Sequence, residues 1–193
     1  MENNLKIAVS GAADLSNCSK DTLKLAQEVG REIVKQGCVL ITGATTGIPY
    51  VAAKAAKAAG GISIGFSPAA SKLSHVKAYK LPTDVFDVIV YTGFNYAGRN
   101  LLMTRAADGI IVIYGRMGTL NEFTIAFEDE KPTAVLEGSG GTADLIRNLL
   151  TMPSRSKKHI IYDTDPKKLV SRLIEAIKKG RAHKKKTLKN AKK

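Results

Sequence analysis

Residues 109–122 read Gly-Ile-Ile-Val-Ile-Tyr-Gly-Arg-Met-Gly-Thr-Leu-Asn-Glu, which is the clearest indication of the fold in the sequence. Its first five residues are apolar and mostly β-branched, which is typical of a strand buried on both faces of a parallel sheet. Glycines at 115 and 118 predict a loop, and helical spacing begins at about Leu120. The stretch therefore predicts a strand, a glycine-bearing loop and a helix, in that order.

The same order repeats along the chain. Short apolar segments predict six further strands at 5–10, 39–42, 62–66, 85–91, 133–136 and 160–162. Helical spacing predicts helices at 21–36, 50–59, 98–107, from about 120, at 144–150 and from 165, with an irregular connection at 67–83. Such alternation predicts an α/β, Rossmann-like fold: a doubly wound, mostly parallel sheet of about seven strands with helices on both faces.

The charge of the chain is concentrated at its end. The 193 residues carry a formal net charge of +13, and nine Lys or Arg residues without an acid lie between 178 and 193. We expect one nucleotide- or phosphate-binding domain over 1–179 and a basic, disordered tail over 180–193, because like charges repel and little apolar surface is available to bury. This tail would attract nucleic acid through its phosphates, or would only keep the protein in solution.

Composition excludes several classes of protein. No apolar stretch is long enough to span a membrane, and the first residues lack the pattern of a secretory signal, so a cytoplasmic protein is expected. The two cysteines form no CxxC motif and the three histidines are not spaced as ligands, so neither a metal nor a cofactor is expected. Aromatic residues make up only 6%, which gives little support to stacking on single-stranded nucleic acid.

Three predicted strand-to-helix loops contain glycine, and parallel sheets bind ligands at that edge. Glycine lets the backbone approach a ligand, and the following helix offers unpaired N–H groups that suit a phosphate. None of the loops is a GxGxxG or Walker A motif, and glycine also serves simple turns. The candidate phosphate-binding glycines are Gly11, Gly43, Gly47, Gly115 and Gly118.

Three further residues each allow two interpretations. Thr119 and Glu122 have the T-x-x-E spacing of a capping box, in which they would only stabilise the start of a helix. Alternatively, the Thr119 hydroxyl and the neighbouring amides bind phosphate, and Glu122 faces the same cleft as an acid, a base or a cation stabiliser. Arg99 suits bidentate recognition of a phosphate or carboxylate, or is a surface residue at a helix start.

Combined, the motifs resemble a known family. The residues Thr92-Gly93, Gly98-Arg99-Asn100, Met103 and Gly115-x-x-Gly118-Thr119-x-x-Glu122 resemble the Lonely Guy (LOG) family, often labelled possible lysine decarboxylases. That family lies within a Rossmann-like superfamily that also includes molybdenum cofactor carrier proteins and the DNA-processing DprA proteins. The resemblance covers residues 6–136 in element order, with its specific motifs in residues 92–132.

The resemblance implies hydrolysis of the N-glycosidic bond of a nucleoside 5′-monophosphate, which gives a base and ribose 5-phosphate. Arg99 and Glu122 would be the catalytic residues, and the G-x-x-G-T loop would hold the phosphate. A carboxylate suits this reaction because it can stabilise an oxocarbenium-like state or activate water. The resemblance also implies a homodimer.

Departures from the family pattern keep other functions open. Tyr114 stands in place of a Pro, Arg116 in place of a Gly and Asn100 in place of a Lys. Asn100 and Arg116 are further candidate ligand-binding residues, and Arg116 would either add a cationic contact or crowd the pocket. The Gly98-Arg99-Asn100 run and Lys131-Pro132 look more like the carrier branch, whose pocket holds a phosphorylated pterin without chemistry. The alternatives are therefore a non-enzymatic nucleotide or molybdenum cofactor carrier or sensor, and a DprA-like nucleic-acid binder.

Overall fold

The computed structural model of the chain describes residues 4–151 and 158–190. Within these residues, seven strands form one parallel sheet. The strands are β1 (Lys6–Gly11), β2 (Val39–Thr42), β3 (Ser63–Ser67), β4 (Val88–Tyr91), β5 (Gly109–Ile113), β6 (Thr133–Leu136) and β7 (Ile160–Asp163). The helices are α1 (Lys20–Lys35), α2 (Ile48–Ala58), α3 (Lys72–Lys77), α4 (Asn95–Ala106), α5 (Met117–Glu128), α6 (Gly141–Leu149) and α7 (Pro166–Asn190).

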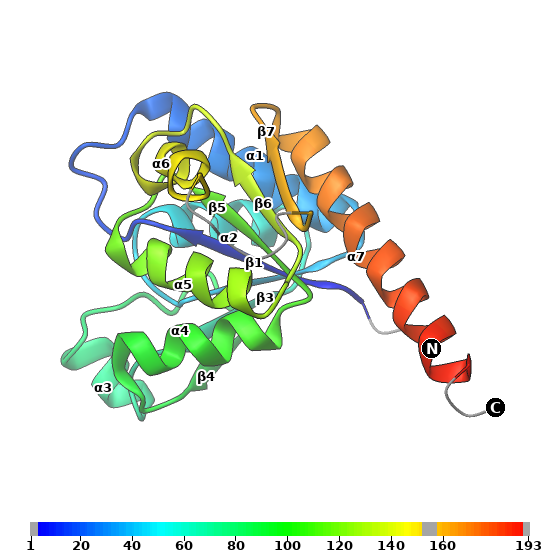
Figure 1. Cartoon of the computed structure of the whole chain (residues 1–193). Helices are drawn as coiled ribbons and strands as arrows, with labels where there is room; N and C mark the ends of the chain where they lie inside the picture. The colour runs from blue at the N-terminus through cyan, green and yellow to red at the C-terminus, as the bar shows by residue number, and fades with distance from the viewer. Residues whose placement is uncertain (1–3, 152–157, 191–193) are drawn as a thin grey trace.

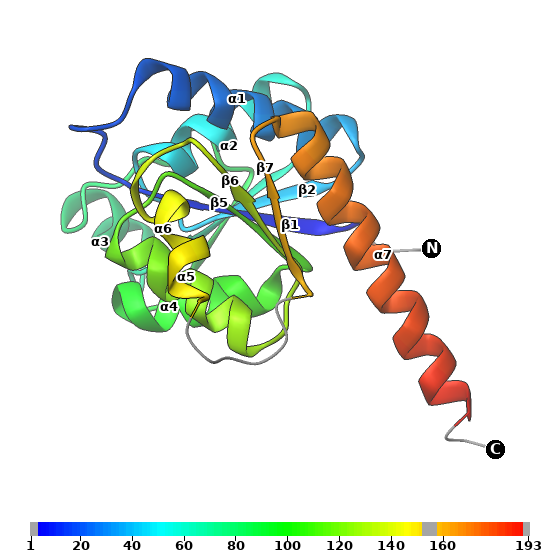
Figure 2. The ribbon, with the colours of Figure 1, turned by 45° about the horizontal axis from the view of Figure 1, so that its top comes forward.

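The sheet is covered on both faces. Its strand order is β4-β3-β2-β1-β5-β6-β7. Figures 1 and 2 show α1, α2 and α7 on one face, and α4, α5 and α6 on the other. The predicted Rossmann-like α/β fold with a doubly wound parallel sheet is therefore confirmed.

The order of the strands reverses between β1 and β5, at the centre of the sheet. Their register places Ser10 beside Val112 and Gly11 beside Ile113, so the two strands end side by side. The loops that follow turn to opposite faces, because β1 leads to α1 and β5 leads to α5. Such a switch point opens a crevice in which α/β proteins bind ligands.

Burial follows the position of each strand. All five residues of β5 are buried, as expected for a central parallel strand that carries Ile and Val on both faces. The edge strand β4 leaves Val88 and Val90 exposed. The predicted strand at 85–91 begins later, at Val88, because the Phe86 N–H donates to the Thr83 carbonyl in a turn ahead of the strand.

Several helices begin earlier than helical spacing predicts. Helix α3 lies in the stretch 67–83 that was predicted to be irregular; its N-cap Ser71 accepts a hydrogen bond from the Ser74 N–H. Helix α4 begins at Asn95 rather than near Gly98, and α5 begins at Met117 rather than near Leu120. Apolar spacing failed here because the first turns of α4 and α5 face a pocket rather than the core.

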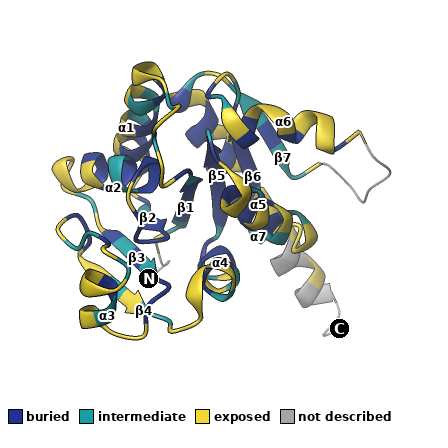
Figure 3. Cartoon of the chain, turned by 90° about the vertical axis from the view of Figure 1, so that its left-hand side faces the viewer, coloured by how far each residue is buried: buried dark blue, intermediate teal, exposed yellow. Residues whose placement is uncertain are grey.

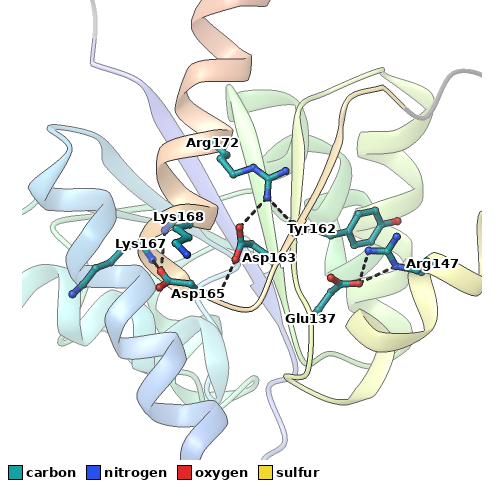
Figure 4. Close-up of polar contacts among 8 residues, drawn as sticks. All are labelled: Glu137, Arg147, Tyr162, Asp163, Asp165, Lys167, Lys168 and Arg172. Carbon is teal, nitrogen blue, oxygen red and sulfur yellow. Dashed lines mark hydrogen bonds and ion pairs between the residues drawn. The ribbon is translucent and has the colours of Figure 1, made fainter.

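The helix predicted from 165 begins at Pro166, and Asp165 caps its first turn. The Asp165 carboxylate accepts hydrogen bonds from the N–H groups of Lys167 and Lys168, at 2.8 and 3.0 Å, ahead of Pro166 (Figure 4). Around it, the charged groups at the ends of β6 and β7 neutralise one another. Arg172 pairs with Asp163 at 2.9 Å, and Arg147 pairs with Glu137 at 2.7 Å.

Helix α7 continues through residues 180–190, where the sequence predicted a disordered tail. Arg181 ties this part of the helix to the domain through an ion pair with Asp108 at 2.7 Å. Asp108 also pairs with Lys6. Alanine, leucine, lysine and arginine have high helix propensity, which explains why the helix extends beyond the predicted boundary. The division of the chain into a domain at 1–179 and a tail stays a prediction.

Candidate functional site

A pocket of about 260 Å³ lies at the switch point, beyond the carboxyl ends of β1 and β5. Figure 3 looks onto this edge of the molecule, with the buried strands β1 and β5 between α1 and α2 on one side and α4 and α5 on the other. Eight of the ten residues predicted from the sequence line the pocket: Gly11, Gly43, Arg99, Asn100, Arg116, Gly118, Thr119 and Glu122.

The other two predicted residues, Gly47 and Gly115, shape the loops without lining the pocket. Both have a positive φ, of +74° and +104°. A Cβ at Gly47 would overlap the carbonyl groups of the β1–α1 loop, and one at Gly115 would overlap the Thr119 side chain. These two glycines are therefore needed for the conformation of the loops. Because neither lines the pocket, their contact with a phosphate stays a prediction.

A buried ion pair forms the floor of the pocket. Arg99 from α4 and Glu122 from α5 are 4% and 6% exposed, and Arg99 Nη1 lies 3.3 Å from Glu122 Oε1. The Ser10 hydroxyl, at the end of β1, donates to Glu122 Oε2. With its side-chain amide turned over, Asn100 donates to Glu122 Oε1 at 3.0 Å and to the Tyr96 carbonyl oxygen at 2.9 Å. Three elements of the switch point thus meet at one carboxylate.

Burial shifts the pKa values of both members of this pair. Loss of water raises the pKa of Glu122 above its usual value, although the Arg99 charge and the Ser10 hydrogen bond act against the shift. Burial also lowers the pKa of Arg99, while Glu122 favours its charged form. Arg99 Nε is buried without a hydrogen-bond partner. The charges of both groups are therefore only partly compensated by the protein, which is common at functional sites.

The capping-box interpretation of Thr119 and Glu122 is wrong. The N-cap of α5 is Arg116, whose side chain makes no capping hydrogen bond, so Thr119 is the third residue of the helix. Glu122 lies one turn further on and is buried against Arg99 rather than folded back onto a cap. Because the first N–H groups of a helix have no partner within it, the amides of Gly118 and Thr119 are free to meet a ligand.

Arg116 lies on the rim of the pocket. Its guanidinium forms an ion pair with Asp14, from the β1–α1 loop, at 2.5 Å. Both side chains are more than half exposed, at 62% and 54%. Arg116 therefore places a cation at the mouth and does not fill the pocket, while a contact between Arg116 and a ligand stays a prediction.

Ser10, Asp14 and Tyr96 also belong to the site, and sequence reasoning missed all three. Asp14 and Tyr96 line the pocket, and Ser10 holds the carboxylate beneath it. Ser10 had a signal, because it is a hydroxyl residue directly before the first glycine loop. Asp14 and Tyr96 had no distinguishing pattern.

The fold and the position of the pocket define the class: a Rossmann-like α/β protein with a candidate ligand site at the switch point of its sheet. Residues 4–170 match the model of the SLOG cluster4 family, and the chain therefore belongs to this family. The narrower assignment to the LOG family rests on the sequence motifs alone. An uncharacterized protein of Archaeoglobus fulgidus is 31% identical over 140 residues, which cover 69% of this chain and 85% of that protein.

Solved structures support the wider superfamily. The molybdenum cofactor binding protein of Rippkaea orientalis is 26% identical with a TM-score of 0.75, over 92% of this chain and 99% of that one. The molybdenum cofactor carrier protein of Chlamydomonas reinhardtii is 23% identical with a TM-score of 0.73, over 90% and 99%. DprA of Streptococcus pneumoniae shares the fold at 21% identity and a TM-score of 0.63, over 87% and 61%.

Two other properties concern only the residues that the structure describes. None of their helices is both long enough and apolar enough to cross a bilayer. Among these residues, no three side chains of His, Cys, Asp or Glu gather in a way that could hold a metal ion.

Proposed function

We propose that the protein binds a phosphate-bearing small molecule, a nucleoside 5′-monophosphate or a pterin phosphate, in the pocket between β1 and β5. The observation that carries this proposal is the convergence of the first amides of α5, at Gly118 and Thr119, with the cations Arg99 and Arg116. Helix N-termini and guanidinium groups both favour phosphate. The pocket volume of about 260 Å³ is close to the lower end of the range of roughly 300–1,000 Å³ that is usual for small-molecule sites, which favours a small ligand.

Hydrolysis is one candidate activity, and the buried carboxylate favours it. Glu122 lines the pocket, so it can face the ribose of a nucleotide whose phosphate lies at the start of α5. There it would stabilise positive charge on the sugar ring or accept a proton from water. Burial raises the pKa of Glu122 above its usual value, and carboxyl groups shifted in this direction serve as general acids or bases in enzymes.

Binding without turnover is the second candidate, and the hydrogen bonds of Glu122 favour it. Oε1 meets Arg99 and Asn100, and Oε2 accepts from Ser10, so both oxygens are engaged within the protein. In a carrier, a carboxylate held in this way would position Arg99 for the ligand and would take no part in chemistry. The similarity to a molybdenum cofactor binding protein also supports a carrier role.

The deciding experiment measures release of ribose 5-phosphate from a panel of nucleoside 5′-monophosphates by the wild-type protein and by Glu122→Gln. Glu128→Gln is the matched control, because Glu128 ends the same helix and is exposed away from the pocket. Melting temperatures with and without the nucleotides and a pterin phosphate report binding in the same samples.

The outcomes separate the two functions. Turnover by the wild type and Glu128→Gln that is lost in Glu122→Gln supports the hydrolase. Ligand-dependent stabilisation without turnover supports the carrier. No stabilisation by any of these phosphates, together with no turnover, contradicts the proposed function as a whole.

A further inference from the structure

One wall of the pocket is aromatic. Among the described residues that line the pocket, Tyr96 is the one aromatic side chain, and the others are glycine, alanine, valine, proline, polar or charged residues. Tyr96 lies in the first turn of α4 and is 49% exposed. A half-exposed ring beside an otherwise mostly small and polar lining offers a flat apolar surface to a ligand.

A second aromatic ring and a hydrogen bond hold the Tyr96 ring in place. Tyr79, which follows α3, meets it edge to face, with ring centroids 5.7 Å apart and planes at 73°. The Tyr79 hydroxyl donates to Asn95 Oδ1 at 2.6 Å, and Asn95 has a φ of +53°. The backbone next to Tyr96 is therefore held in a conformation that side-chain-bearing residues rarely adopt, which fixes where the ring lies.

Tyr96 also lies beside the cation on the pocket floor. Arg99 Cζ is 5.8 Å from the centre of the Tyr96 ring, near the outer limit of a cation–π contact. One role of Tyr96 could thus be to cover Arg99. Such a cover would affect every anionic ligand equally, because it acts through the guanidinium. A surface for a ring would affect only ligands that contain one.

We propose that the heterocyclic ring of the ligand packs on Tyr96, so that the pocket selects ring-bearing phosphate esters over simple sugar phosphates. The inference rests on the proposed function, because the phosphate end anchors the ligand at the start of α5. Stacking on an aromatic side chain tolerates different rings. The Tyr96 wall therefore sets the class of ligand, a phosphorylated heterocycle, while other contacts choose among its members.

The test compares ligands that share a phosphate and differ in the ring. The ring-bearing probes are a carbocyclic adenosine monophosphate, whose base is not released through an oxocarbenium route, and 6-hydroxymethylpterin phosphate. Ribose 5-phosphate is the ring-free probe. Dissociation constants are measured calorimetrically for the wild type, Tyr96→Leu and Tyr96→Phe. Phe94→Leu is the matched control, because Phe94 is an exposed aromatic residue two positions away that does not line the pocket.

We expect the wild type to bind at least one ring-bearing probe about tenfold or more tighter than ribose 5-phosphate. Tyr96→Leu should lose most of this preference without weaker binding of ribose 5-phosphate, whereas Tyr96→Phe and Phe94→Leu should keep the preference.

Equal losses of affinity for all three probes in Tyr96→Leu would mean that Tyr96 only covers Arg99, and would overturn the inference. Equal wild-type affinity for all three probes would also overturn it and leave the proposed function standing. Failure of every probe to bind the wild type would instead contradict the proposed function.

Discussion

The Arg99 guanidinium lies directly against the backbone of Gly43, in the space where a side chain at position 43 would begin. Gly43 lies in the loop after β2 and Arg99 lies in helix α4, and both line the pocket. The absence of a Cβ at position 43 therefore permits the placement of Arg99 over Glu122. Gly43 was predicted as a phosphate-binding residue, and that contact stays a prediction. The structure shows that its lack of a side chain leaves room for the Arg99 guanidinium.

Gly43→Ala should displace Arg99 and uncouple it from Glu122. Moving the guanidinium away from Glu122 leaves a buried polar group without its partner, which costs about 1–3 kcal/mol, so a lower free energy of unfolding is expected in urea. Binding of phosphate ligands should weaken as well. Gly180→Ala is the control, because a Cβ there meets nothing within 4 Å and should leave the stability unchanged or slightly higher. Equal stability and ligand affinity in Gly43→Ala and the wild type would show that Arg99 can move without cost.

Glu122 should make the protein less stable as pH rises. Its pKa is raised in the folded state, so its contribution is fully present below the unfolded pKa and is lost as pH rises through the folded value. Gln cannot ionise, so Glu122→Gln should gain stability relative to the wild type as pH increases above about 4.3, the usual value for Glu. Urea unfolding across pH 4–8 tests this difference. If the wild type instead became more stable relative to the variant as pH rises, the ion pair with Arg99 would favour the charged form of Glu122 more than burial disfavours it.

Asp14→Asn should strengthen binding of a phosphate ligand by releasing Arg116. Hydrogen bonds from Ser16 and the ion pair with Arg116 hold the pKa of Asp14 below its usual value, so the pair is charged at neutral pH. An exposed pair of this kind contributes little because water screens it, so only a modest gain of about two- to fivefold in affinity is expected.

The double variant Asp14→Asn/Arg116→Ala distinguishes release of the arginine from simple removal of an acid. The gain should disappear when Arg116 is absent, and should be smaller at high salt. Asp21→Asn, on the exposed first turn of α1, is the control for a change in net charge. A gain that persists without Arg116 would exclude the release mechanism.

Asp165→Ala should loosen the start of α7. Loss of an N-cap that accepts two backbone hydrogen bonds costs about 1 kcal/mol in the free energy of unfolding. Asp165→Asn retains a capping oxygen and should recover most of the loss. Urea denaturation of the three proteins measures the effect, and an unchanged midpoint in Asp165→Ala would show that packing of α7 alone fixes its first turn.

Truncation after Gly180 should weaken any binding of nucleic acid. It removes the basic residues from Arg181 onward, and contacts between lysine or arginine and phosphate make affinity fall steeply with salt. Affinity for a short duplex and its salt dependence should both decrease, while truncation after Asn190 should change them little. Salt-insensitive binding that is equal in all three chains would place the interaction outside the tail.

The central fold could be predicted because it depends on local patterns. The apolar run of β5 and the glycine that follows it are visible without knowledge of their neighbours. The site could be predicted only in part. Ser10 lies 112 positions from Glu122, and Asp14 lies 102 positions from Arg116, so no spacing rule relates them. The T-x-x-E pattern was ambiguous for another reason, since a cap and a pocket carboxylate share it and only burial against Arg99 separates them.

The pocket at the switch point takes its walls from the loops after β1 and β2 and from the starts of α4 and α5. A ligand in contact with all of them would act as a cross-link between segments up to about a hundred residues apart. Its binding would then suppress local opening at places that it does not touch. Amide hydrogen exchange should therefore slow together in all four segments when the ligand binds. The protection would extend along the carboxyl ends of the central strands, beyond the residues that the ligand contacts.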